Sequence, residues 1–157
     1  MKKDDYGLFP MFVDISEKKA VVIGAGKIAS RRIRTLSEFT ANITVVADRV
    51  DETVRKMAAE GILTLHERAY RREDLYGADI VIAGTDDKNL NSEIYSVCKC
   101  LGILVNVISD RKKCDFHFPG VVKRENLVIG VNAGGRDHRL ARETRERIEE
   151  MMGGQEE

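Results

Sequence analysis

The sequence predicts an α/β fold with a parallel sheet, followed by a small appendage made of a hairpin and a helix. Short apolar runs rich in β-branched residues alternate with stretches of helical spacing, which is typical of right-handed βαβ units. The alternation stops after Asn106, where a polar loop and two strand patterns precede a highly charged helical stretch. We therefore expect one domain over residues 1–109 and the appendage over residues 110–157.

Each expected element follows from its local pattern. The strands are short apolar runs, at residues 19–24, 43–47, 62–66, 78–83 and 102–107. Helices are expected after Gly26 and over residues 51–60 and 87–101. In the appendage, the pattern of residues 116–123 and 127–131 predicts a hairpin with a turn at residues 124–126. A last helix over residues 137–152 has a narrow apolar stripe that suits a partner helix.

Composition excludes several classes of function. The 157 residues carry 26 basic and 26 acidic side chains, so a globally basic nucleic-acid binder is excluded. No apolar run approaches the ~20 residues of a membrane span, and the charged start does not resemble a secretory signal. Three cysteines do not suggest a disulfide framework, and no Cys/His cluster has metal-ligand spacing. We expect a cytoplasmic protein without a resident metal.

The turn between the first strand and the first helix predicts a dinucleotide-binding, Rossmann-like domain. Its sequence fits G-x-G-x-x-A, from Gly24 to Ala29. Gly24 permits the tight turn, Gly26 lets a diphosphate approach the backbone, and Ala29 lets the helix pack close to the sheet. With Lys27 and Ile28, these residues form the start of a helix whose free N–H groups favour an anion.

Two other strand ends extend this expected cofactor site. Asp48 follows the second strand, where a carboxylate accepts hydrogen bonds from an adenosine ribose. This favours NAD over NADP, whereas the neighbouring Arg49 suits NADP. Thr85 follows the fourth strand and is expected to contact the cofactor, and one of Asp86 and Asp87 is expected to cap the next helix.

Several segments together resemble one known family, the NAD-dependent precorrin-2 dehydrogenases of siroheme biosynthesis, some of which are also sirohydrochlorin ferrochelatases. They follow one another over nearly the whole chain: residues 10–15, 21–29, 31–32, 43–47, 82–87, 104–107, 114–119, 134–135 and 140–142. The resemblance implies oxidation of precorrin-2 to sirohydrochlorin with NAD. It also implies a homodimer whose hairpin and following helix are shared between subunits. From the charge balance and the short apolar runs, we expect no nucleic-acid or membrane partner.

The resemblance also implies site residues. Asn106 joins the cofactor-binding set, and the family's catalytic aspartate corresponds to Ser109, with Asp110 next to it. Because serine is a poor base at neutral pH, Asp110 is the favoured proton acceptor, with His117 as the other candidate. For the carboxylates of the substrate, the expected anion site lies at a second glycine turn and the helix after it, with Gly134, Gly135, Arg136, His138, Arg139 and Arg142. The alternative is that these cations only pair with Glu143 and Glu146 on a solvated helix face.

Ser109 in place of the family's aspartate is one departure from the family, and a second concerns the cover of the substrate site. Family members continue with a helical domain that helps to cover the tetrapyrrole, whereas only residues 153–157 follow the last helix here. We expect a more open site, or a cap supplied by another protein. The sequence leaves open whether a metal is inserted, and two other functions: a carrier or sensor that binds but does not turn over, and an NAD-gated domain of a transport system. The last would explain residues 19–106 but not residues 114–142.

Overall fold

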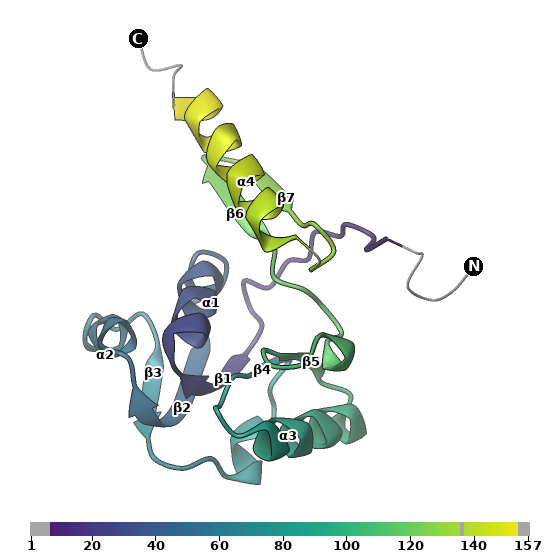
Figure 1. Cartoon of the computed structure of the whole chain (residues 1–157). Helices are drawn as coiled ribbons and strands as arrows, with labels where there is room; N and C mark the ends of the chain where they lie inside the picture. The colour runs from purple at the N-terminus through teal and green to yellow at the C-terminus, as the bar shows by residue number, and fades with distance from the viewer. Residues whose placement is uncertain (1–6, 136, 154–157) are drawn as a thin grey trace. The chain divides into compact units, whose positions relative to one another are not determined.

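The computed structural model describes residues 7–135 and 137–153, which form two compact units (Figure 1). The larger one spans Asp14–His117 and is called the sheet unit here. The smaller one contains residues 7–13, 118–135 and 137–153 and is called the hairpin unit.

Five parallel strands form the centre of the sheet unit. They are β1 (Ala20–Ala25), β2 (Ile43–Val50), β3 (Thr64–Glu67), β4 (Ile80–Ala83) and β5 (Leu104–Val107). Their order in the sheet is β3-β2-β1-β4-β5, and every pair is parallel. The strand order therefore changes direction between β1 and β4, which is the topological switch point where ligands bind in open α/β sheets. The predicted Rossmann-like parallel sheet is confirmed.

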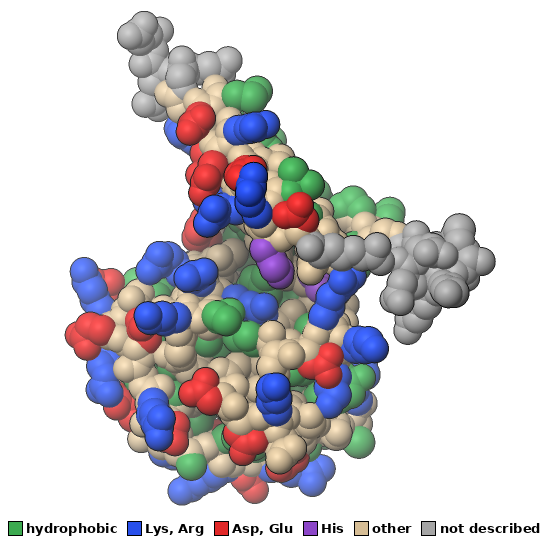
Figure 2. Space-filling view, viewed as in Figure 1, with side chains coloured by type: hydrophobic (Ala, Val, Ile, Leu, Met, Phe, Trp, Pro, Cys, Tyr) green, Lys and Arg blue, Asp and Glu red, His purple; other side chains and the backbone are tan. Residues whose placement is uncertain are grey.

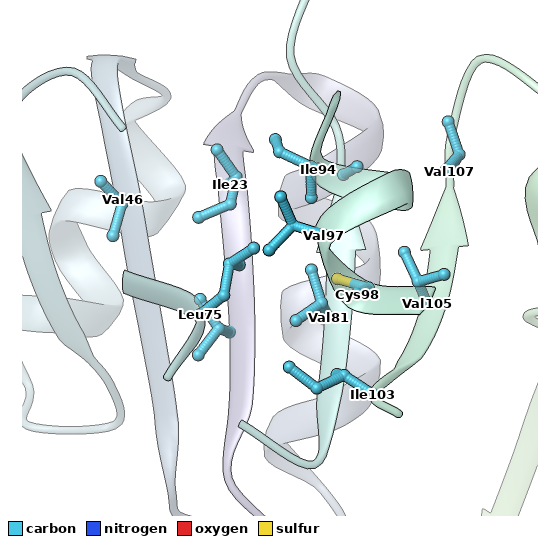
Figure 3. Close-up of a cluster of buried hydrophobic side chains, with 12 residues drawn as sticks. Ile23, Val46, Leu75, Val81, Ile94, Val97, Cys98, Ile103, Val105 and Val107 are labelled. Carbon is cyan, nitrogen blue, oxygen red and sulfur yellow. The ribbon is translucent and has the colours of Figure 1, made fainter. Parts of the chain in front are cut away.

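Helices cover both faces of this sheet. They are α1 (Lys27–Ser37), α2 (Glu52–Ala59) and α3 (Lys88–Leu101). Two short 3₁₀ helices lie in the connections: η2 (Arg72–Leu75) between β3 and β4, and η3 (Arg111–Lys113) after β5. Figure 3 shows the core on the α3 side, where Ile94 and Val97 pack with Leu75 of η2 against Ile23 and Val81 of the strands. Neighbouring residues on β1 point to the opposite face, where Ile33 and Leu36 of α1 are buried. Burial on both faces explains the continuous apolar strand runs.

Residues 110–117 pack on the sheet unit, although the sequence suggested a division after residue 109. The backbone N–H of Asp115 donates to the carbonyl of Val105 (2.8 Å), and its carboxylate accepts from the N–H of Val105 (3.0 Å). Asn106 and Cys114 form an antiparallel bridge beside this pair. This segment therefore extends the β5 edge, so the chain leaves the sheet unit only after His117.

The hairpin unit contains the predicted hairpin and helix. β6 (Gly120–Arg124) and β7 (Leu127–Val131) are antiparallel, and α4 runs over His138–Gly153. Burial in this unit is sparse: Val122 is buried, and no residue of α4 is. Large hydrophobic side chains stay exposed instead, both in residues 8–13 and at Leu127, Leu140 and Met151.

The described part of the chain contains no helix of the length and hydropathy that a membrane crossing requires. On the face shown in Figure 2, basic and acidic side chains are interspersed on each unit, as the equal numbers of the two types suggest.

Candidate functional site

A cleft of about 370 Å³ lies at the carboxyl ends of four neighbouring strands. Its walls are the turn after β1, the end of β2, the loop after β3 and the loop after β4. Of the residues predicted to bind the cofactor, Gly24, Gly26, Asp48 and Thr85 line it. The cleft therefore spans the topological switch point between β1 and β4.

The two glycines of the turn have different reasons to be glycine. Gly24 has a φ of +101°, and a Cβ there would lie 2.4 Å from the carbonyl oxygen of Gly84. Gly24 is therefore required by the close contact between β1 and β4. A Cβ on Gly26 would meet no atom within 4 Å, so at this position the space beside the backbone is open to the cleft.

Helix α1 begins directly at this turn. Gly26 is its N-cap residue and has no side chain to cap the helix, and the first turn carries no acidic residue. The free N–H groups of this turn therefore retain their preference for an anion. Ala29 is buried, 3.4 Å from where a Cβ of Gly84 would lie, which agrees with its predicted role in close packing. Lys27 and Ile28 are exposed, and neither of them nor Ala29 lines the cleft.

Asp48 and Arg49 stand side by side at the end of β2. Both are exposed and both line the cleft. The position matches the one from which a carboxylate binds an adenosine ribose in dinucleotide-binding folds.

A buried amide on α3 holds the loop after β4. Asn91 is only 1% exposed, and its Oδ1 accepts hydrogen bonds from the backbone N–H of Thr85 (3.1 Å) and from the Thr85 hydroxyl (2.7 Å). Its Nδ2 donates to the Thr85 carbonyl (2.9 Å). Asp87 caps α3 by accepting from the N–H groups of Asn89 and Leu90, which confirms the prediction that one of the two aspartates is a cap.

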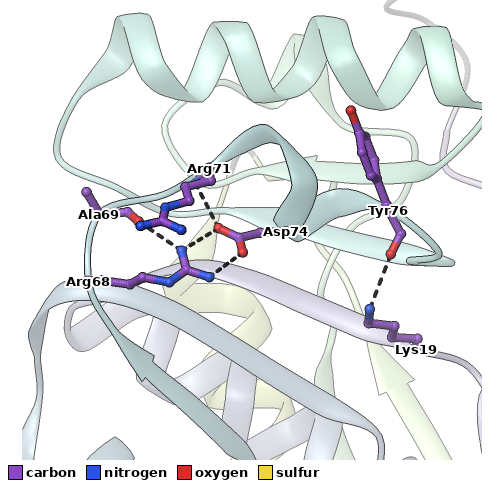
Figure 4. Close-up of polar contacts among 6 residues, drawn as sticks. All are labelled: Lys19, Arg68, Ala69, Arg71, Asp74 and Tyr76. Atoms are coloured by element: carbon purple, nitrogen blue, oxygen red, sulfur yellow. Dashed lines mark hydrogen bonds and ion pairs between the residues drawn. The ribbon is translucent and has the colours of Figure 1, made fainter.

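The loop after β3 forms a wall of the cleft that the sequence analysis missed. Arg68 and Asp74 form a two-point ion pair, with distances of 2.6 and 2.8 Å (Figure 4). Hydrogen bonds from Arg68 are the main reason that the pKa of Asp74 lies below its usual range. Burial raises the pKa of Tyr70, which also lines the cleft, to about 12. An Arg and an Asp six positions apart in a polar loop give no sequence signal for this pairing.

Asn106 does not lie in the cleft. It is 2% exposed, its Nδ2 donates to the carbonyl of Phe116 (2.7 Å), and its Oδ1 accepts from the guanidinium of Arg32. Burial lowers the pKa of this guanidinium. The asparagine thus connects α1, β5 and the segment that follows η3.

The three candidate proton-transfer residues lie beyond the end of β5. The Ser109 hydroxyl accepts from Asn91 Nδ2 (3.3 Å), which places it next to the Thr85 loop. The Asp110 carboxylate accepts from the N–H of Lys112 (3.0 Å) and caps η3. Burial, and then the nearby charges of Arg111 and Arg32, lower the pKa of His117. Its imidazole is therefore neutral at neutral pH and able to accept a proton.

The residues expected to bind the substrate belong to the hairpin unit, and Arg136 lies outside the described residues. Gly134 and Gly135 both have positive φ, and Asp137 caps α4 through the N–H of Leu140 (2.8 Å). His138 is the first residue of α4. Arg139 pairs with Glu143 (2.8 Å) and Arg142 with Glu146 (3.8 Å), as in the solvated-face alternative.

A family model described as "Putative NAD(P)-binding" matches residues 11–120, which include every wall of the cleft. The chain belongs to this NAD(P)-binding family. A nicotinamide dinucleotide is thus confirmed as the class of cofactor.

The curated relatives of this NAD(P)-binding chain are longer proteins. A siroheme synthase of Pseudoalteromonas atlantica is 39% identical over 144 residues, which cover 92% of this chain and 31% of the relative. A siroheme synthase of Psychrobacter sp. is 36% identical, over 92% of this chain and 30% of the relative. The chain therefore spans about a third of the length of these relatives.

A solved structure, "SirC, precorrin-2 dehydrogenase", resembles this one with a TM-score of 0.81 and 25% sequence identity. The match covers 90% of this chain and 69% of that one. Together with the siroheme synthases, it confirms the resemblance to the precorrin-2 dehydrogenase family.

The cleft of the NAD(P)-binding domain fits a dinucleotide. Gly26 leaves room for a diphosphate against the N-terminus of α1, and Asp48 provides a ribose acceptor at the neighbouring strand. Among the described residues, no group of three or more His, Cys, Asp or Glu side chains is arranged to hold a metal ion. Cys98, Cys100 and Cys114 are free thiols.

Proposed function

We propose that this chain catalyses the NAD-dependent oxidation of precorrin-2 to sirohydrochlorin, a step of siroheme biosynthesis, in the cytoplasm. The observation that carries the proposal is the cleft at the switch point, with an open Gly26 at the start of an uncapped helix. The siroheme synthase relatives and the likeness to a precorrin-2 dehydrogenase support the choice of substrate. Insertion of iron into the product, as by a sirohydrochlorin ferrochelatase, is a further part of this proposal, with the metal as a substrate.

The reaction removes two hydrogens from precorrin-2, one as a hydride and one as a proton. When bound, the nicotinamide supplies the hydride acceptor, which leaves the protein with binding, orientation and proton transfer. The backbone at Gly24 and Gly26 and the first turn of α1 bind the diphosphate, and the Asp48 carboxylate accepts hydrogen bonds from the ribose. Thr85 forms the wall on the other side of the switch point.

The proton is taken up by a group beyond β5. Asp110 is the favoured acceptor because it is the carboxylate closest in sequence to the end of this strand, and its capping bond to Lys112 must be given up or shared. His117 is the second candidate, since its lowered pKa keeps the imidazole unprotonated at neutral pH. Ser109 is the third, held beside the Thr85 loop.

We assign the cofactor as NAD rather than NADP. A carboxylate at the position of Asp48 repels the 2′-phosphate of NADP, whereas Arg49, which also lines the cleft, is the residue that would favour NADP. Asp48→Ser should weaken NAD⁺ binding and strengthen NADP⁺ binding, as measured by titration calorimetry with each dinucleotide. An unchanged ratio of the two dissociation constants would contradict the assignment.

The hairpin unit is proposed to form a homodimer. Its support is the exposed apolar surface of residues 8–13 and the absence of buried residues on the described length of α4. Sedimentation equilibrium should give twice the chain mass of 17.6 kDa, and Phe12→Ser should shift the equilibrium toward the monomer. A wild-type chain that sediments as a monomer at all accessible concentrations would exclude this assembly.

The same unit is proposed to bind the substrate carboxylates, through Gly134, Gly135, Arg136, His138 and Arg142. The ion pair between Arg142 and Glu146 is long and exposed, so a bound carboxylate competes with it at small cost.

The deciding experiment is an anaerobic assay of the full chain with precorrin-2 and NAD⁺, in which NADH absorbance and the sirohydrochlorin spectrum are followed together. We expect both to rise in equal amounts. Gly26→Ala serves as the control that keeps the fold and removes the diphosphate site.

One observation favours a second function, a tetrapyrrole and NAD carrier or sensor. The only carboxylate of residues 108–111 caps η3, and Ser109 occupies the position at which the family has its aspartate. Binding of both ligands in calorimetric titrations, together with no NADH formation in this assay, would identify this function.

A further inference from the structure

Asn91 lies on the buried face of α3, in line with the apolar residues Ile94 and Cys98 of the same helix. Burying a primary amide is costly unless its donors and acceptor are hydrogen-bonded. The two sides of the Asn91 amide make four hydrogen bonds, three of them to Thr85 and one to Ser109. Both donors of the amide and its oxygen are therefore hydrogen-bonded, and the two partner residues belong to loops at the carboxyl end of the sheet.

The two loops have different places in the site. Thr85 follows Gly84, whose carbonyl is in tight contact with Gly24, and this loop forms a wall of the dinucleotide cleft. Ser109 follows β5 and precedes Asp110, in the segment that carries the candidate proton-transfer groups. Asn91 connects these loops through one side chain on a rigid helix.

We propose that Asn91 is a positioning residue. It holds the loop at Thr85, which forms a wall of the cleft, in the conformation that binds the dinucleotide, and it holds the loop at Ser109 beside it. The proposal rests on the dinucleotide-binding function proposed above. A loop that is held in its bound shape loses less entropy when the ligand binds, and a helix holds a side chain more precisely than another loop does. The three bonds to Thr85 fix both its backbone N–H and its carbonyl, so this loop cannot rotate its peptide groups without breaking them.

The test compares two asparagines of the same helix. Asn91→Asp keeps the size and the acceptor but replaces the Nδ2 donor with an oxygen that faces the Thr85 carbonyl. Asn89→Asp makes the same chemical change at an exposed position two residues away. Thr85→Val removes the hydroxyl that donates to Asn91 Oδ1, and with it the contacts of this hydroxyl to the backbone of Asp87, the N-cap residue of α3. Each full-length variant is measured by NAD⁺ titration calorimetry and by its thermal midpoint without ligand.

We expect Asn91→Asp to weaken NAD⁺ binding about tenfold, and Thr85→Val to weaken it severalfold, while Asn89→Asp stays within about twofold of the wild type. In the precorrin-2 assay at saturating NAD⁺, Asn91→Asp should also lower kcat, because the Ser109 loop loses its bond to Nδ2. A purely structural role would lower the thermal midpoint and leave the dissociation constant of the folded protein unchanged.

The outcomes separate the two proposals. If the wild type binds NAD⁺ and both Asn91→Asp and Thr85→Val bind it as tightly, the positioning role is overturned and the dinucleotide site stands. If the wild type takes up no nicotinamide dinucleotide, the proposed function itself fails.

Discussion

Replacing Gly24 and Gly26 separately with alanine should have two different effects: the first substitution lowers the stability of the protein, and the second lowers its affinity for NAD⁺. At Gly24, a φ of +101° costs an L residue roughly 1–2 kcal/mol. The new Cβ would also lie 2.4 Å from the Gly84 oxygen and 2.6 Å from its carbonyl carbon, both of them backbone atoms that move only with β4. Overpacking of this kind typically costs about 1–3 kcal/mol. Gly24→Ala should therefore destabilise the protein by about 2–5 kcal/mol and lower its thermal midpoint by at least about 5 °C.

Gly26→Ala is the matched control, because its Cβ would meet no protein atom within 4 Å. Its thermal midpoint should fall by no more than about 4 °C, since alanine in place of glycine at an N-cap costs up to about 1 kcal/mol and the added methyl group meets no protein atom. Its affinity for NAD⁺ should fall by more than about tenfold, because the methyl group occupies the space through which a diphosphate approaches the backbone. Calorimetric titration and thermal melts measure the two quantities on the same samples. Wild-type affinity in Gly26→Ala would refute the placement of the diphosphate.

Three further outcomes follow from the sheet unit. Asp74→Asn should lower the free energy of unfolding by about 1–3 kcal/mol at neutral pH. The pKa of Asp74 is lowered in the fold, chiefly by Arg68. The contribution of Asp74 to stability is therefore present above its ordinary pKa of 3.8 and is lost as the pH falls through the lower folded value. Urea titrations at several pH values will show that the difference in unfolding free energy between variant and wild type shrinks in acid. Cys98, whose pKa is raised to about 11 by burial, should resist alkylation in the folded protein while the exposed Cys100 reacts, and peptide mapping will contradict the fold if the order is reversed. Ile94→Ala should cost about 2–5 kcal/mol in urea unfolding, and a loss below about 1 kcal/mol would mean that α3 does not pack as described.

The sequence predicts the sheet well because burial on both faces leaves a local signal. The runs at β1 and β4 are buried over their length, β2 is apolar from Val45 to Ala47, and each of these strands is followed by a helix pattern. The third strand was expected at residues 62–66 and begins instead at Thr64. The reason is local: the N–H of Ile62 donates to the Met57 carbonyl (3.0 Å) and closes α2, so this residue is not available to the ladder.

The first strand of the hairpin shows what local pattern cannot predict. It was expected over residues 116–123, but it begins at Gly120. Asn106 Nδ2 binds the Phe116 carbonyl, and Asp115 pairs with Val105, so residues 115 and 116 are held at the edge of the sheet unit. These are contacts across about ten positions of sequence, and the alternation of apolar residues contains no information about them.

The same limitation applies to the site residues, because the role of a polar side chain depends on what faces it in the fold. Gly24 and Gly26 are predictable since their role is a property of the backbone at a motif. Asn106 and Asp110 carry the right chemical groups, yet their side chains bind a backbone carbonyl and a backbone N–H within their own unit.

Asn91, in contrast, holds a wall of the cleft, although it belongs to no motif that predicts a function. Its signal is a polar residue on the stripe that continues through Ile94 and Cys98, where a helix normally buries apolar side chains. A buried amide at such a position must find partners for both of its ends, and the loops at the carboxyl ends of β4 and β5 are within reach of the first turns of the helix between them. In a sheet of parallel strands, a polar interruption early in a crossover helix thus points to the loops beside the cofactor, because those loops hold the polar backbone groups that the buried side chain needs.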